Sequence, residues 1–188
     1  INLGSYYDAK SEFTRALDSY FQAMKLFEKI NDDKGIAGSS LGTGNVFQNL
    51  SNNKKAIEYY QKSLFHYKKI NSPYVSWALN NLATCYEKNG DIEKAAALYE
   101  ESLSLKLKEQ DFYGAVFSIN NLGLMFMKKK DYKKALHYFK RSQMICREKN
   151  LEKETFANAF RNLAEVYLQM KDLQNDADFP GITKDLKV

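Results

Sequence analysis

The sequence predicts an all-α fold, a right-handed superhelical solenoid of antiparallel helix hairpins. Three observations support this prediction. The 188-residue chain has only two prolines and nine glycines, which disfavours an all-β fold with many turns. Small and aromatic residues recur in one register with a period of about 40 residues. Short polar segments separate the recurring blocks, as expected for stacked hairpins that bury one continuous core.

The repeat consists of two blocks of residues. The first is a small residue followed three residues later by an aromatic one, and it starts at Gly4, Gly44, Ala83, Gly123 and Ala164. The second is an alanine, an aromatic residue four positions later and a small residue three positions further on. Its alanines are Ala16, Ala56, Ala95 and Ala135. Residues three or four apart share one helix face, so each block predicts a helix whose small residues allow a close antiparallel neighbour.

Four hairpins and a half repeat follow in order along the chain. The hairpins span about 1–31, 34–70, 73–110 and 112–149, and the half repeat spans 152–171. Turns inside the hairpins are expected at Lys10-Ser11, Ser51-Asn52-Asn53, Asn89-Gly90-Asp91 and Lys130-Asp131. Turns between the units are expected at Asn31-Asp32-Asp33, Asn71-Ser72-Pro73, Gln110-Asp111 and Asn150-Leu151. Residues 1–171 therefore form the predicted repeat array.

The pattern stops after the half repeat. Asp176 stands where the next alanine is due, and Phe179-Pro180-Gly181 interrupts any second helix. We therefore expect residues 172–188 to be a C-terminal tail. An array without caps exposes apolar faces, so end-to-end self-association is also expected. The chain opens at Ile1 without a signal-peptide pattern, and we expect it to be a piece of a longer protein.

Composition disfavours several classes of protein. The mean hydropathy is −0.55, and no apolar run approaches the ~18 residues of a membrane span. Cys85 and Cys146 form no CxxC motif, and His66 and His137 belong to no metal-binding pattern. No catalytic constellation is present, so we predict no enzyme activity, no cofactor and no metal. The cysteine usage suits a reducing compartment, which predicts a cytoplasmic protein without membrane contact.

The net charge of +5 is unevenly distributed. Residues 128–149 carry nine Lys and Arg residues against Asp131 and Glu148. A basic surface of this kind attracts nucleic acid or an acidic partner. The alternative is that the lysines simply occupy solvated turns and outer helix faces. Nucleic-acid binding is the less favoured function because the basic residues do not recur at repeat spacing.

The residue pattern, G/A-x2-Y followed by A-x3-F/Y-x2-A/S, resembles the tetratricopeptide repeat family over residues 1–171. Two departures are the period, about 40 residues against the usual ~34, and the missing proline at each repeat end. Such long repeats resemble those of kinesin light chains, Pins-type adaptors and bacterial Rap-type or sensor-kinase-associated regulators. The resemblance implies a concave groove lined by the first helix of each repeat.

Asparagines concentrate on the helix face that would line this groove. Nine of the sixteen asparagines lie there, and the other seven lie at turns or in the tail. A carboxamide both donates and accepts hydrogen bonds, so it can bracket the peptide bond of a ligand. The alternative is that these side chains satisfy neighbouring helices. The candidate peptide-binding residues are Asn45, Trp77, Asn80, Asn81, Phe117, Asn120, Asn121, Lys128, Asn158, Arg161 and Asn162.

Three of these candidates have more specific expected roles. Trp77 and Phe117 open their helices one repeat apart, where they either form a pocket for a ligand side chain or pack against the preceding hairpin. Arg161 is suited to a ligand carboxylate. The leading hypothesis is thus a non-enzymatic module that binds a peptide segment, as the scaffold or sensor part of a larger cytoplasmic protein; the resemblance points to bacterial signalling. The alternatives are a nucleic-acid-binding module using 128–149, and a Rap-like regulator, which requires an N-terminal helical bundle in addition.

Overall fold

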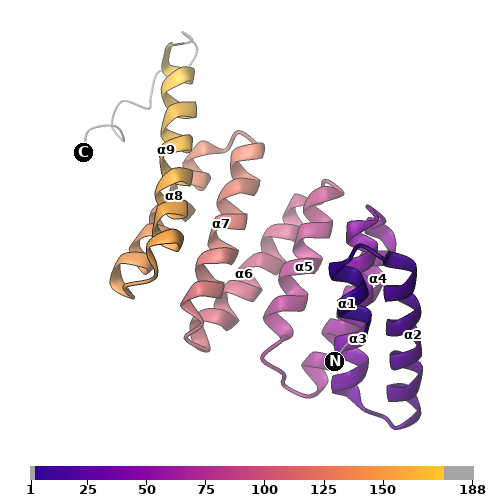
Figure 1. The fold of residues 1–188 in the computed structure, drawn as a ribbon. Helices are drawn as coiled ribbons and strands as arrows, with labels where there is room; N and C mark the ends of the chain where they lie inside the picture. Colours follow the sequence, from indigo (N-terminus) through magenta and orange to yellow (C-terminus); the bar gives the residue numbers. More distant parts are fainter. Residues whose placement is uncertain (1–2, 176–188) are drawn as a thin grey trace. The chain divides into compact units, whose positions relative to one another are not determined.

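The computed structural model describes residues 3–175, apart from the side chains of residues 153, 156 and 172–175. Within that range the chain forms helices and no strand, which confirms the predicted all-α hairpin repeat (Figure 1). Most of the expected tail, residues 176–188, lies outside the described range. The helices are α1 (Leu3–Ala9), α2 (Phe13–Lys29), α3 (Asp33–Asn49), α4 (Asn53–Lys69), α5 (Val75–Lys88), α6 (Ile92–Lys108), α7 (Phe112–Lys128), α8 (Tyr132–Glu148) and α9 (Lys153–Asn175). The last helix thus runs past the boundary expected at residue 171.

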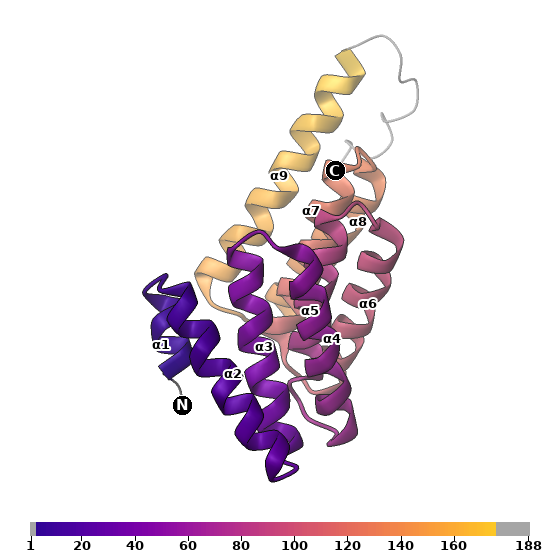
Figure 2. The same cartoon turned by 90° about the vertical axis from the view of Figure 1, so that its right-hand side faces the viewer.

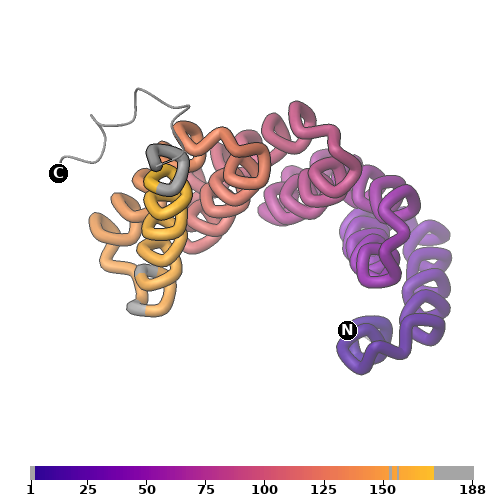
Figure 3. Tube along the Cα trace, turned by 90° about the horizontal axis from the view of Figure 1, so that it is seen from above, coloured from indigo at the N-terminus to yellow at the C-terminus, as the bar shows by residue number. Residues whose placement is uncertain are grey.

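Contacts divide the chain into two units, residues 1–105 and 106–188. In the first unit, α1 packs on α2 and α3 packs on α4 as antiparallel pairs, and α2 also contacts α3 (Figure 2). Helices α1 and α3 contact each other directly, so first helices share one layer. Figure 3, which looks along the helices, shows the chain of this unit alternating between two rows. In the second unit, α7 pairs with α8, and α9 contacts both.

The core repeats the same contact in successive hairpins, between the small residue of the first helix and the aromatic ring of the second. A methyl group placed on Gly44 would lie 2.5 Å from Tyr60 Cε1, and one on Gly4 would lie 2.7 Å from Tyr20 Cε1. Tyr60 and the alanine of its block, Ala56, are fully buried. The small residues therefore act as predicted: they open space for a ring between two closely packed helices.

Each expected turn contains one residue with positive φ. Gly90 has φ +82°, and the others are Ser11, Asn31, Ser51, Asn71, Gln110, Lys130 and Asn150, with φ between 49° and 60°. This left-handed residue ends the preceding helix. The next helix then starts with an Asx cap in most repeats; for example, Asp131 Oδ1 accepts a hydrogen bond from the Lys134 backbone N–H at 3.1 Å.

A cation–aromatic contact ties the two helices of each complete hairpin together. The basic residue directly before the repeat alanine lies over the aromatic ring of the preceding helix. The distances from cation to ring centroid are 5.5 Å for Arg15–Tyr7, 5.0 Å for Lys55–Phe47, 5.2 Å for Lys94–Tyr86 and 5.0 Å for Lys134–Phe126. In three of these hairpins the same cation also pairs with the acidic residue at the helix start. In each complete hairpin, a cation therefore lies over the ring of the aromatic residue of the first block.

The turn geometry makes a prediction at two equivalent positions, Gly90 and Lys130. A methyl group on Gly90 would meet nothing within 4 Å, so Gly90→Ala changes only the backbone energy. A left-handed L-residue costs about 1–2 kcal/mol, partly offset by a stiffer unfolded chain, so we expect a loss of about 1 kcal/mol. Lys130→Gly should have the opposite sign and stabilise by up to about 1 kcal/mol. Urea denaturation of both variants checks this, and shifts of the same sign would contradict the turn assignment.

Candidate functional site

In the first unit, two of the predicted asparagines form a hydrogen-bonded pair across adjacent repeats. Asn81 Nδ2, on α5, donates to Asn45 Oδ1, on α3, at 3.1 Å. The Tyr60 hydroxyl, from α4, donates to the same Asn45 oxygen at 2.8 Å. Both asparagines are half-buried. The first helices thus place two carboxamides side by side. The bond between them joins two neighbouring helices, which is the contact expected if these asparagines satisfy neighbouring helices; their role in peptide binding stays a prediction.

Tyr60 holds this pair from beneath. Its ring is fully buried against Gly44, and its hydroxyl also donates to Gln48 Oε1 at 3.1 Å. Burial raises the pKa of Tyr60 above its ordinary value, so the phenol stays protonated and keeps donating. Asn45 is therefore fixed by two donors. Within the described residues, Asn81 Oδ1 has no hydrogen-bond partner and remains open to a ligand N–H.

The other two candidates of the first unit differ in exposure. The Trp77 side chain is 57% exposed. Its ring is therefore not packed tightly against the preceding hairpin, which was one of the two alternatives for this residue. Asn80 is only 5% exposed. Its side chain turns into the protein, which differs from the expectation of an open groove residue. A position on the helical face does not fix burial, because the adjacent helices of a layer cover part of that face.

In the second unit, α7 repeats this arrangement with Phe117, Asn120 and Asn121. Phe117 is 57% exposed, both asparagines are half-buried, and Lys128 at the helix end is exposed. Asn120 Oδ1 is buried without a hydrogen-bond partner in the part of the chain that the structure describes. Such an unpaired acceptor is uncommon in a folded protein.

A buried lysine lies beneath Phe117. Lys106 is 4% exposed, donates from Nζ to the Gly114 carbonyl at 3.2 Å, and has its ammonium 5.8 Å from the Phe117 ring centroid. Burial lowers the pKa of Lys106. The Lys106 side chain, at the end of α6, therefore supports the exposed ring on α7, a role that its place in the sequence did not indicate.

The α9 candidates interact among themselves. Arg161 Nη2 donates to Asn158 Oδ1 at 2.9 Å, one helical turn earlier. The Arg161 side chain is exposed, and Asn162 is half-buried. Arg161 therefore points to solvent with one of its donors engaged. Its role in binding a ligand carboxylate stays a prediction.

Residues that could carry other chemistry occupy structural positions. Cys85 and Cys146 are both free and buried, and burial raises the pKa of each thiol, to about 11 for Cys85. His66 Nδ1 lies 2.6 Å from Asp33 Oδ1, and Lys69 pairs with the other oxygen at 2.8 Å. Hydrogen bonds from Lys69 and His66 lower the pKa of Asp33. In the described residues, no three His, Cys, Asp or Glu side chains gather as metal ligands, and no helix is long and apolar enough to cross a membrane.

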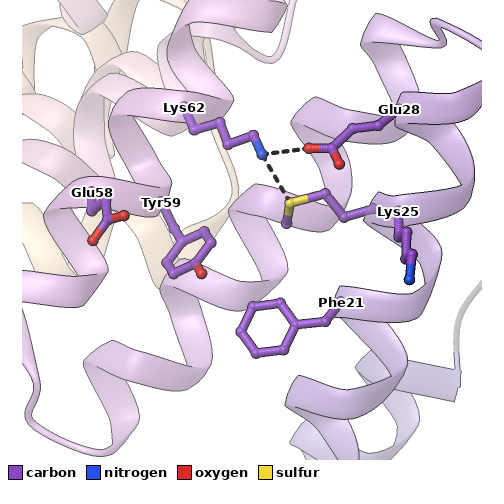
Figure 4. Close-up of a pocket in the computed structure, with 7 residues that line it drawn as sticks. Phe21, Lys25, Glu28, Glu58, Tyr59 and Lys62 are labelled. Carbon is purple, nitrogen blue, oxygen red and sulfur yellow. Dashed lines mark hydrogen bonds and ion pairs between the residues drawn. The ribbon is translucent and has the colours of Figure 1, made fainter.

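A cleft that the repeat pattern does not indicate lies between the second helices α2 and α4. Its volume is about 490 Å³, and it is lined by Phe21, Met24, Lys25, Glu28, Glu58, Tyr59 and Lys62 (Figure 4). Lys62 Nζ bridges the two helices by pairing with Glu28 Oε1 at 2.7 Å and donating to Met24 Sδ at 3.3 Å. The lining residues follow no repeat spacing, so periodicity could not reveal them.

Among the curated relatives of this chain, one is named as a phosphatase of response regulators and one as an assembly protein. Response regulator aspartate phosphatase A of Bacillus subtilis is 26% identical over 199 residues, which cover 94% of this chain and 50% of the relative. The photosystem I assembly protein Ycf3 of Rippkaea orientalis is 31% identical over 105 residues, with 56% of each chain covered. The chain therefore spans about half the length of these relatives.

Solved structures show the same fold at lower identity. BtubC of P. vanneervenii has a TM-score of 0.80 at 21% identity and covers 92% of this chain and 72% of its own. A putative kinesin light chain of Podosopora anserina gives 0.76 at 17%, covering 92% and 86%. A Rap protein complexed with Competence and Sporulation Factor gives 0.70 at 20%, covering 93% and 49%. These likenesses concern the fold alone.

Family models settle the classification. Two models described as tetratricopeptide repeat match residues 36–108 and 118–149, together more than half of the chain. The matched segments contain the second to fourth hairpins, where the small and aromatic residues of the repeat pack as predicted. The chain belongs to the tetratricopeptide repeat family.

Proposed function

We propose that this chain is a non-enzymatic interaction module that binds a peptide segment of a partner protein on the exposed face of its first helices. The observation that carries the proposal is the Asn81–Asn45 pair, whose Asn81 oxygen is open at the surface. A carboxamide that is held in place by one hydrogen bond can form further hydrogen bonds to the peptide group of a ligand. Such contacts do not depend on the side chains of the ligand. Because Tyr60 and Asn45 fix the pair in advance, little ordering entropy is lost when a ligand binds.

The exposed rings support the same function. Trp77 in the first unit and Phe117 in the second each lie on the first-helix face that carries the asparagines. An exposed aromatic ring next to polar donors is a common anchor for a ligand side chain. Exposure of a lone apolar residue is ordinary in itself, so the rings support the proposal through their placement beside the carboxamides.

The comparisons supply a precedent for partner binding. One structural relative, a Rap protein, was solved in complex with Competence and Sporulation Factor, and the curated relatives include a response regulator phosphatase and an assembly protein. We propose that this chain likewise acts as a scaffold or sensor part of a signalling or assembly protein in the cytoplasm. Two buried free thiols agree with a reducing compartment.

The test is a double substitution, Asn81→Ala with Asn121→Ala, measured against a peptide recovered from a partner by cross-linking and mass spectrometry. Each lost hydrogen bond is worth about 0.5–1.5 kcal/mol, so affinity in calorimetry should fall roughly ten- to several-hundred-fold. Stability should change little, because Asn45 keeps its bond from Tyr60 and alanine favours the helix. A variant that melts several degrees lower yet binds normally would reject the proposal.

The electrostatic alternative has its own matched variant. Lys129 and Lys130 are exposed at the α7–α8 turn, away from the asparagines. Neutralising both as Lys129→Gln and Lys130→Gln should leave the peptide affinity nearly unchanged. A large loss there, with strong dependence on salt, would instead favour binding of nucleic acid or an acidic partner by residues 128–149.

A further inference from the structure

The α2–α4 cleft lies on the second-helix layer and takes no part in the function proposed above. Its apolar part is a pair of rings, Phe21 and Tyr59, with centroids 5.8 Å apart at an angle of 44°. Phe21 is 39% exposed. Tyr59 is held from behind by Phe47, whose ring stacks on it at 5.5 Å. The buried Met24 thioether, 5% exposed, forms the floor. The cleft therefore has two aromatic rings on its sides and a polarisable thioether at its bottom.

One end of the cleft is closed by charges that satisfy each other. Lys62 pairs with Glu28 and also donates to Met24 Sδ, as Figure 4 shows. A ligand that enters beside this bridge does not need to break it, because both charges already have partners. The bridge spans α2 and α4, and the cleft is present in the structure without a ligand.

The remaining two charges at the cleft are unpaired. Lys25, on α2, and Glu58, on α4, are exposed, and neither has an ion-pair partner among the described residues. The Tyr59 hydroxyl likewise has no described hydrogen-bond partner. A cation and an anion on opposite helices, with apolar rings between them, are complementary to a segment in which an apolar residue separates two opposite charges.

We propose that this cleft is a second protein-binding site, which takes one large apolar side chain of a partner segment flanked by an acidic residue facing Lys25 and a basic residue facing Glu58. The volume of about 490 Å³ leaves room for a large apolar side chain together with parts of its two neighbours. The mixed charge argues against nucleic acid, which requires a uniformly basic surface. This site would let the module hold two proteins at once, one on each helix layer.

Met24 provides a direct reporter of binding. Of the five methionines, Met24 is the only one in residues 1–105, and the others are Met125, Met127, Met144 and Met170. With methyl-labelled methionine, the probes are the capped peptides Ala-Glu-Phe-Lys-Ala and Ala-Lys-Phe-Glu-Ala, titrated to about 5 mM to reach a millimolar Kd. At least one should shift the Met24 methyl signal saturably while Met125 and Met170 stay unchanged. A peptide with serine in place of phenylalanine should give no shift.

Charge-neutral variants test the flanking contacts without disturbing the fold. In Lys25→Gln with Glu58→Gln, the better charged peptide should bind about two- to fivefold more weakly, down to the level of a Gln-Phe-Gln control. In Phe21→Ala the Met24 response should disappear. Absence of a Met24 shift in the wild type, or equal binding of the serine peptide, overturns the proposal. Asn81→Ala should leave this titration unchanged, so failure here and failure of the first-helix site are distinguishable.

Discussion

Gly123→Leu should destabilise the second unit by about 3 kcal/mol or more, one of the two largest effects we expect in this protein. A methyl group on Gly123 already overlaps the ring of Phe139, which is fully buried in the α7–α8 hairpin. The ring belongs to the core cluster that also contains Ala135, Val166 and Met170, so it has no space to move into. Helix propensity favours leucine over glycine by only about 1 kcal/mol, and the overlap therefore dominates.

The measurement is thermal and urea unfolding, with two comparisons that isolate the cause. Gly38→Ala is the matched control, because a methyl group there meets only Tyr67 Oη, at 3.7 Å, an ordinary contact. That variant should gain up to about 1 kcal/mol from helix propensity. Phe139→Ala combined with Gly123→Leu should cost less than the sum of the two single changes, since one residue fills the space left by the other. Strict additivity would show that the two residues do not share a contact.

Tyr60→Ala should destabilise the first unit by about 3–5 kcal/mol, the usual cost of truncating a buried aromatic residue. The Tyr60 side chain is fully buried, and its hydroxyl is one of two donors to Asn45. Tyr60→Phe keeps the ring and removes only the hydroxyl, so it should cost about 1–2 kcal/mol. The difference between the two variants separates packing from hydrogen bonding in urea denaturation.

The same pair of variants bears on the candidate site. Tyr60→Phe leaves Asn45 held only by Asn81, so the carboxamide pair becomes less ordered while the fold survives. Peptide affinity should then fall severalfold, less than in the asparagine variants. An unchanged affinity in Tyr60→Phe would mean that orientation of Asn45 contributes nothing to binding, and would restrict the site to Asn81 and the aromatic anchors.

The fold could be predicted from the sequence because a repeat shows each contact several times. One small residue three positions before an aromatic one indicates little, but five such pairs in one register define the helices. The turns between the helices all contain a left-handed residue. The basic residue before each repeat alanine was equally visible: Arg15, Lys55, Lys94 and Lys134 occupy the same position. Its role needed the structure, because nothing in the spacing says that the cation reaches a ring of the previous helix.

The candidate site was predictable only in part. The helical faces placed Asn45 of α3 and Asn81 of α5 on equivalent sides of their helices, and the structure brings the two side chains into hydrogen-bond contact. The helical faces left open whether Trp77 packs against the preceding hairpin, and the structure shows its ring exposed. They could not predict the burial of Asn80, which depends on how closely neighbouring helices approach. The cleft at Phe21 and Tyr59 depends on two second helices at once, and its residues do not repeat. The face of a single helix can thus be predicted from the sequence. A contact or cleft between two helices can be predicted only where its residues recur in several repeats.

The cation–aromatic contact at each turn has a consequence for how the chain folds. Arg15 and Tyr7, like the equivalent pair in each later hairpin, are only eight positions apart in sequence, and in three of the four hairpins an acidic residue at the helix start lies between them. Closing so short a loop costs little chain entropy. The contact can therefore form locally within one hairpin before the neighbouring hairpin packs on it, so folding can begin at any repeat and spread along the array.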